Sequence, residues 1–407
     1  MEKKRILYGV CAVSVIIGLT ICFVIAYNIT KKSEGETTTS NTSTSTTSKL
    51  DSIKTTNETE EETSKSETEV EEQVSTESVA LTDSKTVNIT SGGTYDLSGS
   101  YESVTINTDD EKVTLNLTNV EITNSNGPAI NIVESDKVTI VLSGTNKITS
   151  TTTEDLDGAI YSKADLTLAG TGSLEVKSNY DGIVSKDDLV IENGVYDINS
   201  DDDGIRGKDC VEITTGEFTI NAGGDGIKSS NEEDTTRGYV TIKGGTFNIT
   251  AKSDGIQAIT KLTIDGGTFD ITASEGLEAT YVVINDGTIN ISASDDGINA
   301  SKKSTISTPT VEINGGNITI KMGQGDTDGI DSNGNIYING GTIDITGNSP
   351  FDYDGTAQKN GGTIIVNGTQ TDTITNQMMG GGMGGPGGMQ GFNDGQMTPP
   401  SGGQRMR

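Results

Sequence analysis

Hydrophobic and polar residues alternate with a period of two through most of this chain. In one stretch Val240 and Ile242 form such a pair, and Phe247 and Ile249 form the next. A period of two is typical of β-strands, which turn successive side chains to opposite faces. We therefore predict short strands, and no helical periodicity is present beyond the N-terminal segment.

The alternating pairs belong to a repeat marked by an acidic residue followed by glycine. The plainest copies are Asp254-Gly255, Asp296-Gly297 and Asp328-Gly329. The acids of the repeat are 21 to 32 residues apart, at Asp157, Asp181, Asp203, Asp225, Asp254, Glu275, Asp296, Asp328 and Asp354. Units of about 22 residues built only of strands and glycine corners are typical of a solenoid. We predict an all-β fold, a right-handed, single-stranded parallel β-helix of about 12 coils.

Two further features fit that fold. Tyr196, Phe218, Phe247 and Phe269 fall at matching, inward-facing positions of the repeat and are expected in the core. Insertions at residues 229–238 and 301–310 fall at the same place in the repeat, so they are expected to project from one edge of the solenoid.

Composition divides the chain into four segments. A basic flank followed by a long uncharged apolar run predicts a signal-anchor transmembrane segment at residues 1–30, with a cleaved signal peptide as the alternative. A tract of Ser, Thr and Glu predicts a disordered linker at 31–83. The β-helix is expected at 84–376, and a disordered Gly/Met-rich tail at 377–407. This layout predicts a domain held on the extracellular face of a membrane.

The charge balance excludes some partners. The chain has 59 acidic and 28 basic residues, a net charge of −31, and no histidine. Nucleic-acid binding needs clustered Lys and Arg, so we expect no nucleic-acid partner. Cys210 is the one cysteine outside the apolar run, so disulfides cannot stabilise the domain, which we expect to be a monomer.

The acids of the repeat are candidate metal ligands. If the coils stack in register, corresponding carboxylates lie ~4.8 Å apart and repel one another by ~0.9 kcal/mol per pair even in water. With so few bases, we predict that no row of cations neutralises them. Ligand sets of oxygen alone suit Ca²⁺. The candidates are Asp181, Asp202, Asp203, Asp225, Asp254, Glu275, Asp295 and Asp296. Alternatively these pairs are turn residues only, with Asp bonding its own backbone and Gly taking a positive φ.

The repeated Asp-Gly-Ile phrases, the Gly-Gly-Thr-Phe units, the N-terminal anchor, the Ser/Thr linker and the Gly/Met tail together resemble a family of bacterial surface proteins described as carbohydrate-binding domain-containing. The chain is also similar to pectate-lyase-like β-helix proteins. This resemblance implies binding of Ca²⁺, of acidic plant polysaccharide such as polygalacturonate, and of cellulose, at a bacterial membrane or cell wall. It carries over to the Asp-Gly corners as calcium sites, and Glu275 departs from the pattern.

The net charge of −31 bears on how such a polymer is held. An acidic polysaccharide would need bridging Ca²⁺, and Tyr180, Lys186, Arg206 and Lys228 are candidate carbohydrate contacts. We predict a non-catalytic carbohydrate-binding protein. One alternative is a calcium-dependent polysaccharide lyase that uses Arg206 or Lys228 as its base. Another is a structural surface adhesin. A polygalacturonase-like hydrolase is disfavoured because that family's site uses a histidine.

Overall fold

The computed structural model describes residues 79–81, 85–324 and 327–376, and every regular element among them is a β-strand. The predicted membrane segment at 1–30 and the tail at 377–407 lie outside the described residues. Within the described part of the chain, no helix is long and apolar enough to cross a membrane. One boundary was wrong: β1 (Val79–Leu81) lies inside the predicted linker, because its backbone pairs with β3 (Gly93–Tyr101).

The strands form two sheets, of 24 and 12 strands. The 12-stranded sheet, called here the third ladder, takes one strand from each successive part of the chain. Its members are β2 (Thr86–Ile89), β4 (Ser103–Asn107), β6 (Ile130–Glu134), β9 (Gly158–Ser162), β12 (Asp181–Ser185), β15 (Ile205–Gly207), β18 (Ile227–Ser229), β21 (Asp254–Gln257), β24 (Glu275–Ala279), β27 (Ile298–Ala300), β30 (Asp328–Ser332) and β33 (Ser349–Tyr353).

The 24-stranded sheet contains two ladders that share the long strands β3 and β5 (Lys112–Asn124). The first ladder begins at β1, runs through β3 and β5, and continues with β7 (Lys137–Ser143), β10 (Asp165–Gly170), β13 (Asp188–Ile191), β16 (Cys210–Ile213), β19 (Tyr239–Ile242), β22 (Lys261–Ile264), β25 (Tyr281–Ile284), β28 (Thr310–Ile313), β31 (Asn335–Ile338) and β34 (Ala357–Lys359). The second ladder continues with β8 (Thr145–Ser150), β11 (Ser173–Ser178), β14 (Val195–Ser200), β17 (Glu217–Ala222), β20 (Thr246–Ala251), β23 (Thr268–Ala273), β26 (Thr288–Ala293), β29 (Asn317–Met322), β32 (Thr342–Thr346), β35 (Thr363–Val366) and β36 (Thr369–Thr371).

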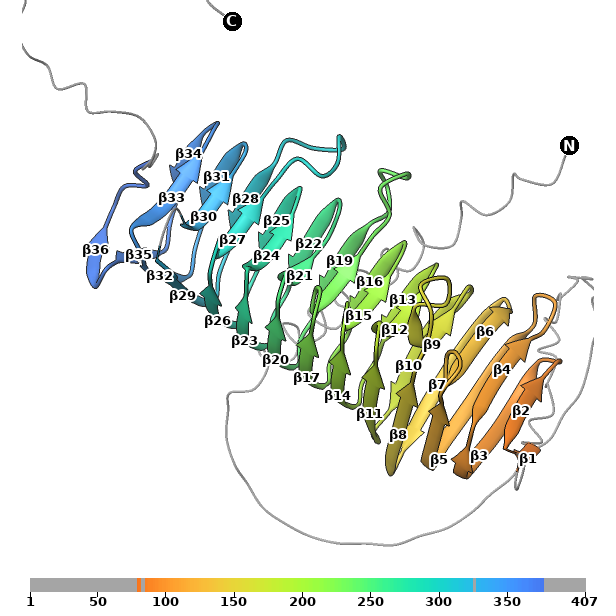
Figure 1. The fold of residues 1–407 in the computed structure, drawn as a ribbon. Coiled ribbons are helices and arrows are strands. Elements are labelled where there is room, and N and C mark those ends of the chain that lie inside the picture. Colours follow the sequence, from red (N-terminus) through yellow and green to blue (C-terminus); the bar gives the residue numbers. More distant parts are fainter. Residues whose placement is uncertain (1–78, 82–84, 325–326, 377–407) are drawn as a thin grey trace, which may run out of the picture. The chain divides into compact units, whose positions relative to one another are not determined.

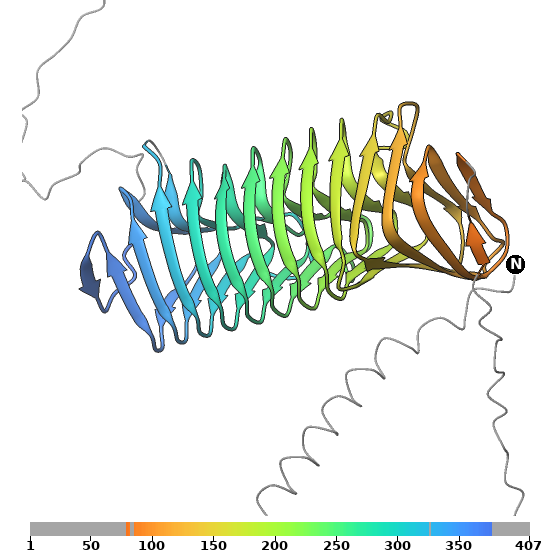
Figure 2. The same ribbon diagram turned by 90° about the horizontal axis from the view of Figure 1, so that it is seen from below.

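Each turn of chain contributes one strand to each ladder, and like strands stack on one another along a single axis (Figures 1 and 2). The pairings within all three ladders are parallel, apart from the antiparallel pair of β35 with β36 at the C-terminal end. This arrangement is consistent with the predicted parallel β-helix, whereas its hand and its number of coils stay predictions.

The core forms because every second side chain of a strand points inward. Strands such as β20 and β23 alternate exposed and buried positions throughout. The predicted inward aromatics are buried, and their rings are stacked in register, with centroids 4.9, 4.7 and 4.6 Å apart along Tyr196, Phe218, Phe247 and Phe269. Offset or parallel ring stacking adds to the apolar burial, so this column ties four neighbouring coils together.

Glycine has two different roles in the repeat. At the turns before the second ladder, Gly245 adopts φ +119°, which other residues resist. The glycines of the repeated acid-Gly pairs, such as Gly226 and Gly255, do not have a positive φ, so that part of the turn interpretation was wrong. A Cβ on Gly226 would lie 2.5 Å from the carbonyl oxygen of Gly255 and 2.5 Å from Cγ2 of Ile249. Glycine is needed there because neighbouring coils approach closely.

The two insertions leave the solenoid on the same side, as predicted. The loops between β18 and β19 and between β27 and β28 extend beyond the other connections (Figure 1). Each loop also returns a basic side chain to the body of the solenoid, where it contacts carboxylates described below.

Candidate functional site

The acids of the repeated acid-Gly pairs, apart from Asp354, lie at the corner where the chain enters the third ladder. We call this row of acids the acidic corner: Asp157, Asp181, Asp203, Asp225, Asp254, Glu275, Asp296 and Asp328. Asp181, Asp203, Asp225 and Asp254 are buried, whereas Glu275 and Asp296 are half-buried. Corner carboxylates are therefore brought together in a row, as the sequence predicted.

The first function of this row is structural. A corner Oδ1 accepts a hydrogen bond from the backbone N–H of the next corner acid along the chain, so it joins two coils rather than bonding its own backbone. Four corner residues do this: Asp181 from Asp203 (3.0 Å), Asp203 from Asp225 (2.9 Å), Asp225 from Asp254 (2.9 Å) and Asp296 from Asp328 (3.2 Å). Asp254 and Glu275 accept no such bond from the following coil within the described part of the chain.

Arg206 overturns the prediction that no cations neutralise the corner. Its Nε donates to Oδ2 of Asp181 at 2.7 Å, and its Nη2 contacts the carboxylates of both Asp157 and Asp181. Nε also lies 3.6 Å from Oδ2 of Asp203. The prediction failed because it compared totals of acids and bases, whereas the repeat places this one guanidinium among three acids.

Lys228 and Lys186 also pair with corner carboxylates. Nζ of Lys228 lies 2.6 Å from Oδ2 of Asp225 and 3.4 Å from that of Asp203, and Nζ of Lys186 lies 3.1 Å from Oδ2 of Asp157. Burial acts to lower the pKa of Lys228, but the charges of Asp203 and Asp225 raise it above its usual range. In this N-terminal half, corner carboxylates are held by cations of the chain itself.

Burial still disfavours the charged state of these acids. It raises the pKa of Asp181 to about 7, with Arg206 opposing the rise. Burial also raises the pKa of Asp203, and there Lys228 is the main opposing charge. The ion pairs therefore offset a desolvation cost.

After Lys228, no further basic residue takes the corresponding position in the coils described. Residues three positions after each corner acid from Asp181 onward stack in register on the outer face of the third ladder, in the order Val184, Arg206, Lys228, Gln257, Glu278, Asn299 and Asp331. The first half of this outer row supplies cations, and the second half supplies amides and further acids. Lys303 is the one ion-pair partner recorded there among the described residues.

Three carboxylates come together where the cations stop. One oxygen from each of Asp254, Glu275 and Glu278 lies within 4.8 Å of the others, and Asp254 and Glu278 are buried. We call these three residues the carboxylate cluster. Gln257 donates Nε2 to Oδ2 of Asp254 and, at 3.0 Å, to Oε2 of Glu278. Asn299 donates Nδ2 to Oε2 of Glu275 at 3.0 Å.

Burial and mutual repulsion act strongly on these acids. Burial raises the pKa of Asp254 to about 8, with Asp225 and Glu278 adding to the rise. It raises the pKa of Glu275 to about 7, again with Glu278 contributing. Asp296, one coil on, has its pKa raised to about 8 by burial and by Asp331. Asp254, Glu275 and Asp296 are therefore in an environment that favours either a proton or a bound cation. Burial acts to raise the pKa of Glu278 as well, but hydrogen bonds with Asp254, Lys303 and Ser301 lower it below its usual value.

The other predicted metal ligands are arranged differently. Asp202 is exposed but brings an oxygen within 4.8 Å of Asp181 and Asp203, whose carboxylates already pair with Arg206 and Lys228. Asp295 is exposed and belongs to none of the carboxylate groups found among the described residues. Asp165, Asp187 and Asp188 form a further group at the first ladder. Arg237, from the first insertion, lies 3.0 Å from Oδ1 of Asp188.

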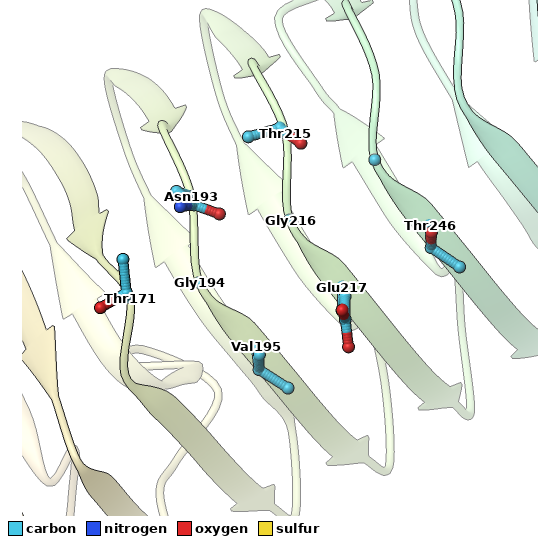
Figure 3. Close-up of a pocket in the computed structure, with 9 residues that line it drawn as sticks. Thr171, Asn193, Gly194, Val195, Thr215, Gly216, Glu217 and Thr246 are labelled. Atoms are coloured by element: carbon cyan, nitrogen blue, oxygen red, sulfur yellow. The ribbon is translucent and has the colours of Figure 1, made fainter.

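Tyr180, predicted as a carbohydrate contact, is half-buried directly before Asp181. A groove of about 250 Å³ lies elsewhere, at the glycine corner before the second ladder. Figure 3 shows Asn193, Thr215 and Thr246 along it, on successive coils. Glu217 is the one charged residue of its lining, and no aromatic ring lines it, so the groove offers neither a ligand set for a cation nor a stacking surface for a sugar.

Glu278, Asn299 and Lys303 were missed from the sequence. The signal for the first two was present, because each lies three residues after a corner acid, where Arg206 and Lys228 also lie. Lys303 carried no such signal, since it belongs to an insertion that the repeat does not cover.

Comparison with known proteins now places the chain. The family model of carbohydrate-binding domain-containing proteins matches residues 83–329 and 275–384, which together span the solenoid. The chain belongs to this family. No curated protein matches it. A solved structure titled "Structure of the polysaccharide lyase-like protein from C. thermocellum, Gadolinium derivative" is similar at 22% identity, covering 70% of this chain and 89% of that one, with a TM-score of 0.30.

Membership of the carbohydrate-binding domain-containing family supports a polysaccharide-binding role. The matched region includes the whole acidic corner and all the residues of the outer row. A carbohydrate-binding surface that includes the corner therefore lies within the residues that the family model matches.

Proposed function

We propose that this protein is a non-catalytic carbohydrate-binding protein of the bacterial cell surface, which binds an acidic, polygalacturonate-like polysaccharide through calcium. The observation that carries the proposal is the C-terminal half of the acidic corner. There Asp254, Glu275 and Asp296 of the corner, with Asp331 of the adjoining outer row, present carboxylates on successive coils, and none of the four has an ion-pair partner among the described residues.

Calcium is the species that reconciles this surface with an acidic polymer. Two sets of carboxylates repel each other, and Ca²⁺ accepts six to eight oxygens from both in flexible geometry. Its chemistry here would be to link corner oxygens to uronate oxygens. The repeated coil spacing presents similar acids along the axis, which suits a polymer of repeated charged sugars better than a small ligand.

Direct ion pairs with the polymer are a weaker explanation. Lys186, Arg206 and Lys228 each contact at least one corner carboxylate already. A uronate would have to replace those contacts and leave buried Asp181 or Asp225 without its partner, which is costly. These three residues are better suited to supporting the corner than to holding the polysaccharide.

The same contacts favour binding over catalysis. A general base must give up its proton near neutral pH, so a catalytic lysine needs a lowered pKa. Asp203 and Asp225 raise the pKa of Lys228, against the effect of burial, and Asp181 and Asp157 do the same for Arg206. The lyase alternative therefore lacks a suitable base at either predicted position.

The test uses the full-length chain in detergent, since its N-terminus carries the apolar run. The protein is incubated with insoluble polygalacturonate, with calcium and with a chelator, and sedimented. Fully methyl-esterified polymer, which has the same backbone without the charge, is the matched control. We expect retention that needs both calcium and free carboxylates, with no unsaturated product in the supernatant.

Retention that persists in chelator, or on the esterified polymer, would refute calcium bridging. Formation of unsaturated product that is lost in Lys228→Met would establish a lyase. Absence of retention on both polymers would refute the polysaccharide function and favour the structural adhesin.

A further inference from the structure

Three groups of carboxylates close enough to share a cation occur in the described part of the chain, and they differ in how their charge is already balanced. Arg237 contacts the group at the first ladder, and Arg206 and Lys228 contact the group at Asp181 and Asp203. These cations come from the chain and lie between pairs of acids. The carboxylate cluster has a single cation, Lys303, which reaches one of its three acids.

The hydrogen bonds that join successive corner acids are interrupted at the carboxylate cluster. In Asp181, Asp203 and Asp225, Oδ1 accepts a hydrogen bond from the backbone N–H of the next corner acid. Asp254 and Glu275 do not: Oδ2 of Asp254 and Oε2 of Glu275 accept side-chain amide bonds from Gln257 and Asn299, and no backbone N–H of the next corner acid binds either carboxylate in the described part of the chain. Hydrogen bonds between coils account for the carboxylates of Asp181, Asp203 and Asp225 and do not account for these two.

A buried amide supplies a second, independent sign of a missing ligand. Asn299 is 8% exposed, and its Oδ1 has no hydrogen-bond partner. Its Nδ2 contacts Glu275, and its backbone pairs in register beside Glu278. Buried amide oxygens are rarely left unsatisfied. Half a turn of the amide would present Oδ1 to the space beside Glu275, where a cation would satisfy both oxygens.

We propose that Asp254, Glu275, Glu278 and the amide oxygen of Asn299 form a divalent-cation site for Ca²⁺, and that Lys303 is its built-in competitor. This inference deepens the proposed function, on which its biological role rests, by assigning the cation to one coil boundary of the corner rather than to the whole row. Glu278, Asn299 and Lys303 are the residues that define it.

Lys303 acts as a tethered counter-ion. It lies in the second insertion, its Nζ is 2.6 Å from Oε2 of Glu278, and its side chain is 24% exposed. Ser301, at the base of the same loop, donates Oγ to the other oxygen, Oε1, at 2.7 Å. A dication on the carboxylate cluster would repel the ammonium group, so calcium binding requires Lys303 to leave Glu278, and the mobile end of a lysine can do so at small cost.

The experiment titrates Ca²⁺ into the full-length, chelator-treated chain by calorimetry, with no polysaccharide present. Glu278→Gln and Asp254→Asn should weaken binding at least about tenfold, because each removes a charged ligand. Asp270→Asn is the matched control, since it removes one charge from the same turn of chain at an exposed position of β23. It should leave affinity unchanged.

Two variants should strengthen Ca²⁺ binding, an effect that misfolding of the chain would not produce. Asn299→Asp adds a charged oxygen and should tighten Ca²⁺ about tenfold, and Lys303→Met removes the competitor and should tighten it about threefold. The inference is overturned if the wild-type chain takes up no Ca²⁺. It is also overturned if Asp203→Asn abolishes binding while Glu278→Gln does not, or if Lys303→Met weakens it.

This outcome separates from that of the proposed function. Calcium uptake at these residues without retention on polygalacturonate would support the cation site and refute the polysaccharide function. Calcium-dependent retention on the polymer, by a chain that takes up no Ca²⁺ when the polymer is absent, would refute the cation site and support the polysaccharide function.

Discussion

Arg206 bridges coils: from β15 it donates Nε to the carboxylate of Asp181, at the start of β12, and also contacts Asp157. Its Nε also lies 3.6 Å from Oδ2 of Asp203, so one guanidinium links acids from three successive turns of chain. The side chain is 17% exposed and that of Asp181 is 2% exposed, so the contact is largely desolvated. Removing one partner of such a pair leaves a buried charge alone.

Arg206→Ala should therefore destabilise the solenoid by about 3 kcal/mol. The change is measured as the loss of unfolding free energy in urea, followed by circular dichroism. Lys177→Ala is the control, because that lysine also pairs with an acid, Glu175, but at an exposed site. Its effect should stay below about 0.5 kcal/mol. Equal effects of the two variants would show that the Arg206 contacts add no more stability than an exposed ion pair.

Gly226→Ala should destabilise the protein by about 3 kcal/mol, because the added Cβ meets backbone of the next coil at 2.5 Å and that backbone cannot yield alone. Gly244→Ala is the matched substitution. A Cβ there has its nearest neighbour at 3.7 Å, an ordinary contact, so its melting temperature should stay near that of the wild type. If Gly226→Ala melts like the wild type, the close approach of coils at the acid-Gly pairs is wrong.

Phe247→Ala should cost about 3 to 5 kcal/mol, since the ring is 1% exposed and stacks on both Phe218 and Phe269. Phe247→Leu keeps most of the apolar volume and loses the stacking, so it should cost less. Chemical denaturation of both variants measures the difference. A leucine variant as unstable as the alanine variant would mean that ring stacking, rather than filled volume, dominates the column.

In the absence of calcium, the protein should be more stable at pH 5 than at pH 8. Burial raises the pKa of Asp187 and of Asp331 to about 6, and that of Asp296 to about 8, from an ordinary value of 3.8. An acid with a raised pKa binds its proton more tightly in the folded state. Its stabilising contribution is complete below the unfolded pKa and is lost as pH rises through the folded value.

The measurement is the melting temperature of the chelator-treated chain between pH 4 and pH 9. We expect a fall across the range from about pH 5 to about pH 8. Asp296→Asn should make the upper part of that fall smaller, because the amide does not titrate. A melting temperature that rises with pH over this range would show that these acids are stabilised as carboxylates.

Much of the fold was readable from particular residues. The alternation around Phe247 and Ile249 predicted strands, and the matching positions of Tyr196, Phe218 and Phe269 predicted a stacked core column. The corner acids were predicted to lie in a row, and they do. What failed was the charge argument, since a total of 28 bases says nothing about where Arg206 and Lys228 stand relative to Asp181 and Asp203.

The acid-Gly motif is a second case in which the sequence did not show the physical reason for a residue. The sequence allowed a turn in which Gly takes a positive φ, but Gly226 and Gly255 are glycines because the next coil leaves no room for a Cβ. That crowding involves residues more than 20 positions apart in the chain. Local propensity cannot report it.

By itself, the sequence determined the strands, the repeat and the set of acids that share a corner, because period-two alternation and a fixed repeat length dictate which residues stack. Only the tertiary structure decided which acids are neutralised and which are not. That outcome depends on the register of the outer row, where Arg206 and Lys228 are followed by Gln257 and Glu278, and on a lysine returned by an insertion loop. Electrostatic energy depends on distances of a few ångström between side chains from different coils, and those distances exist only once the coils have stacked.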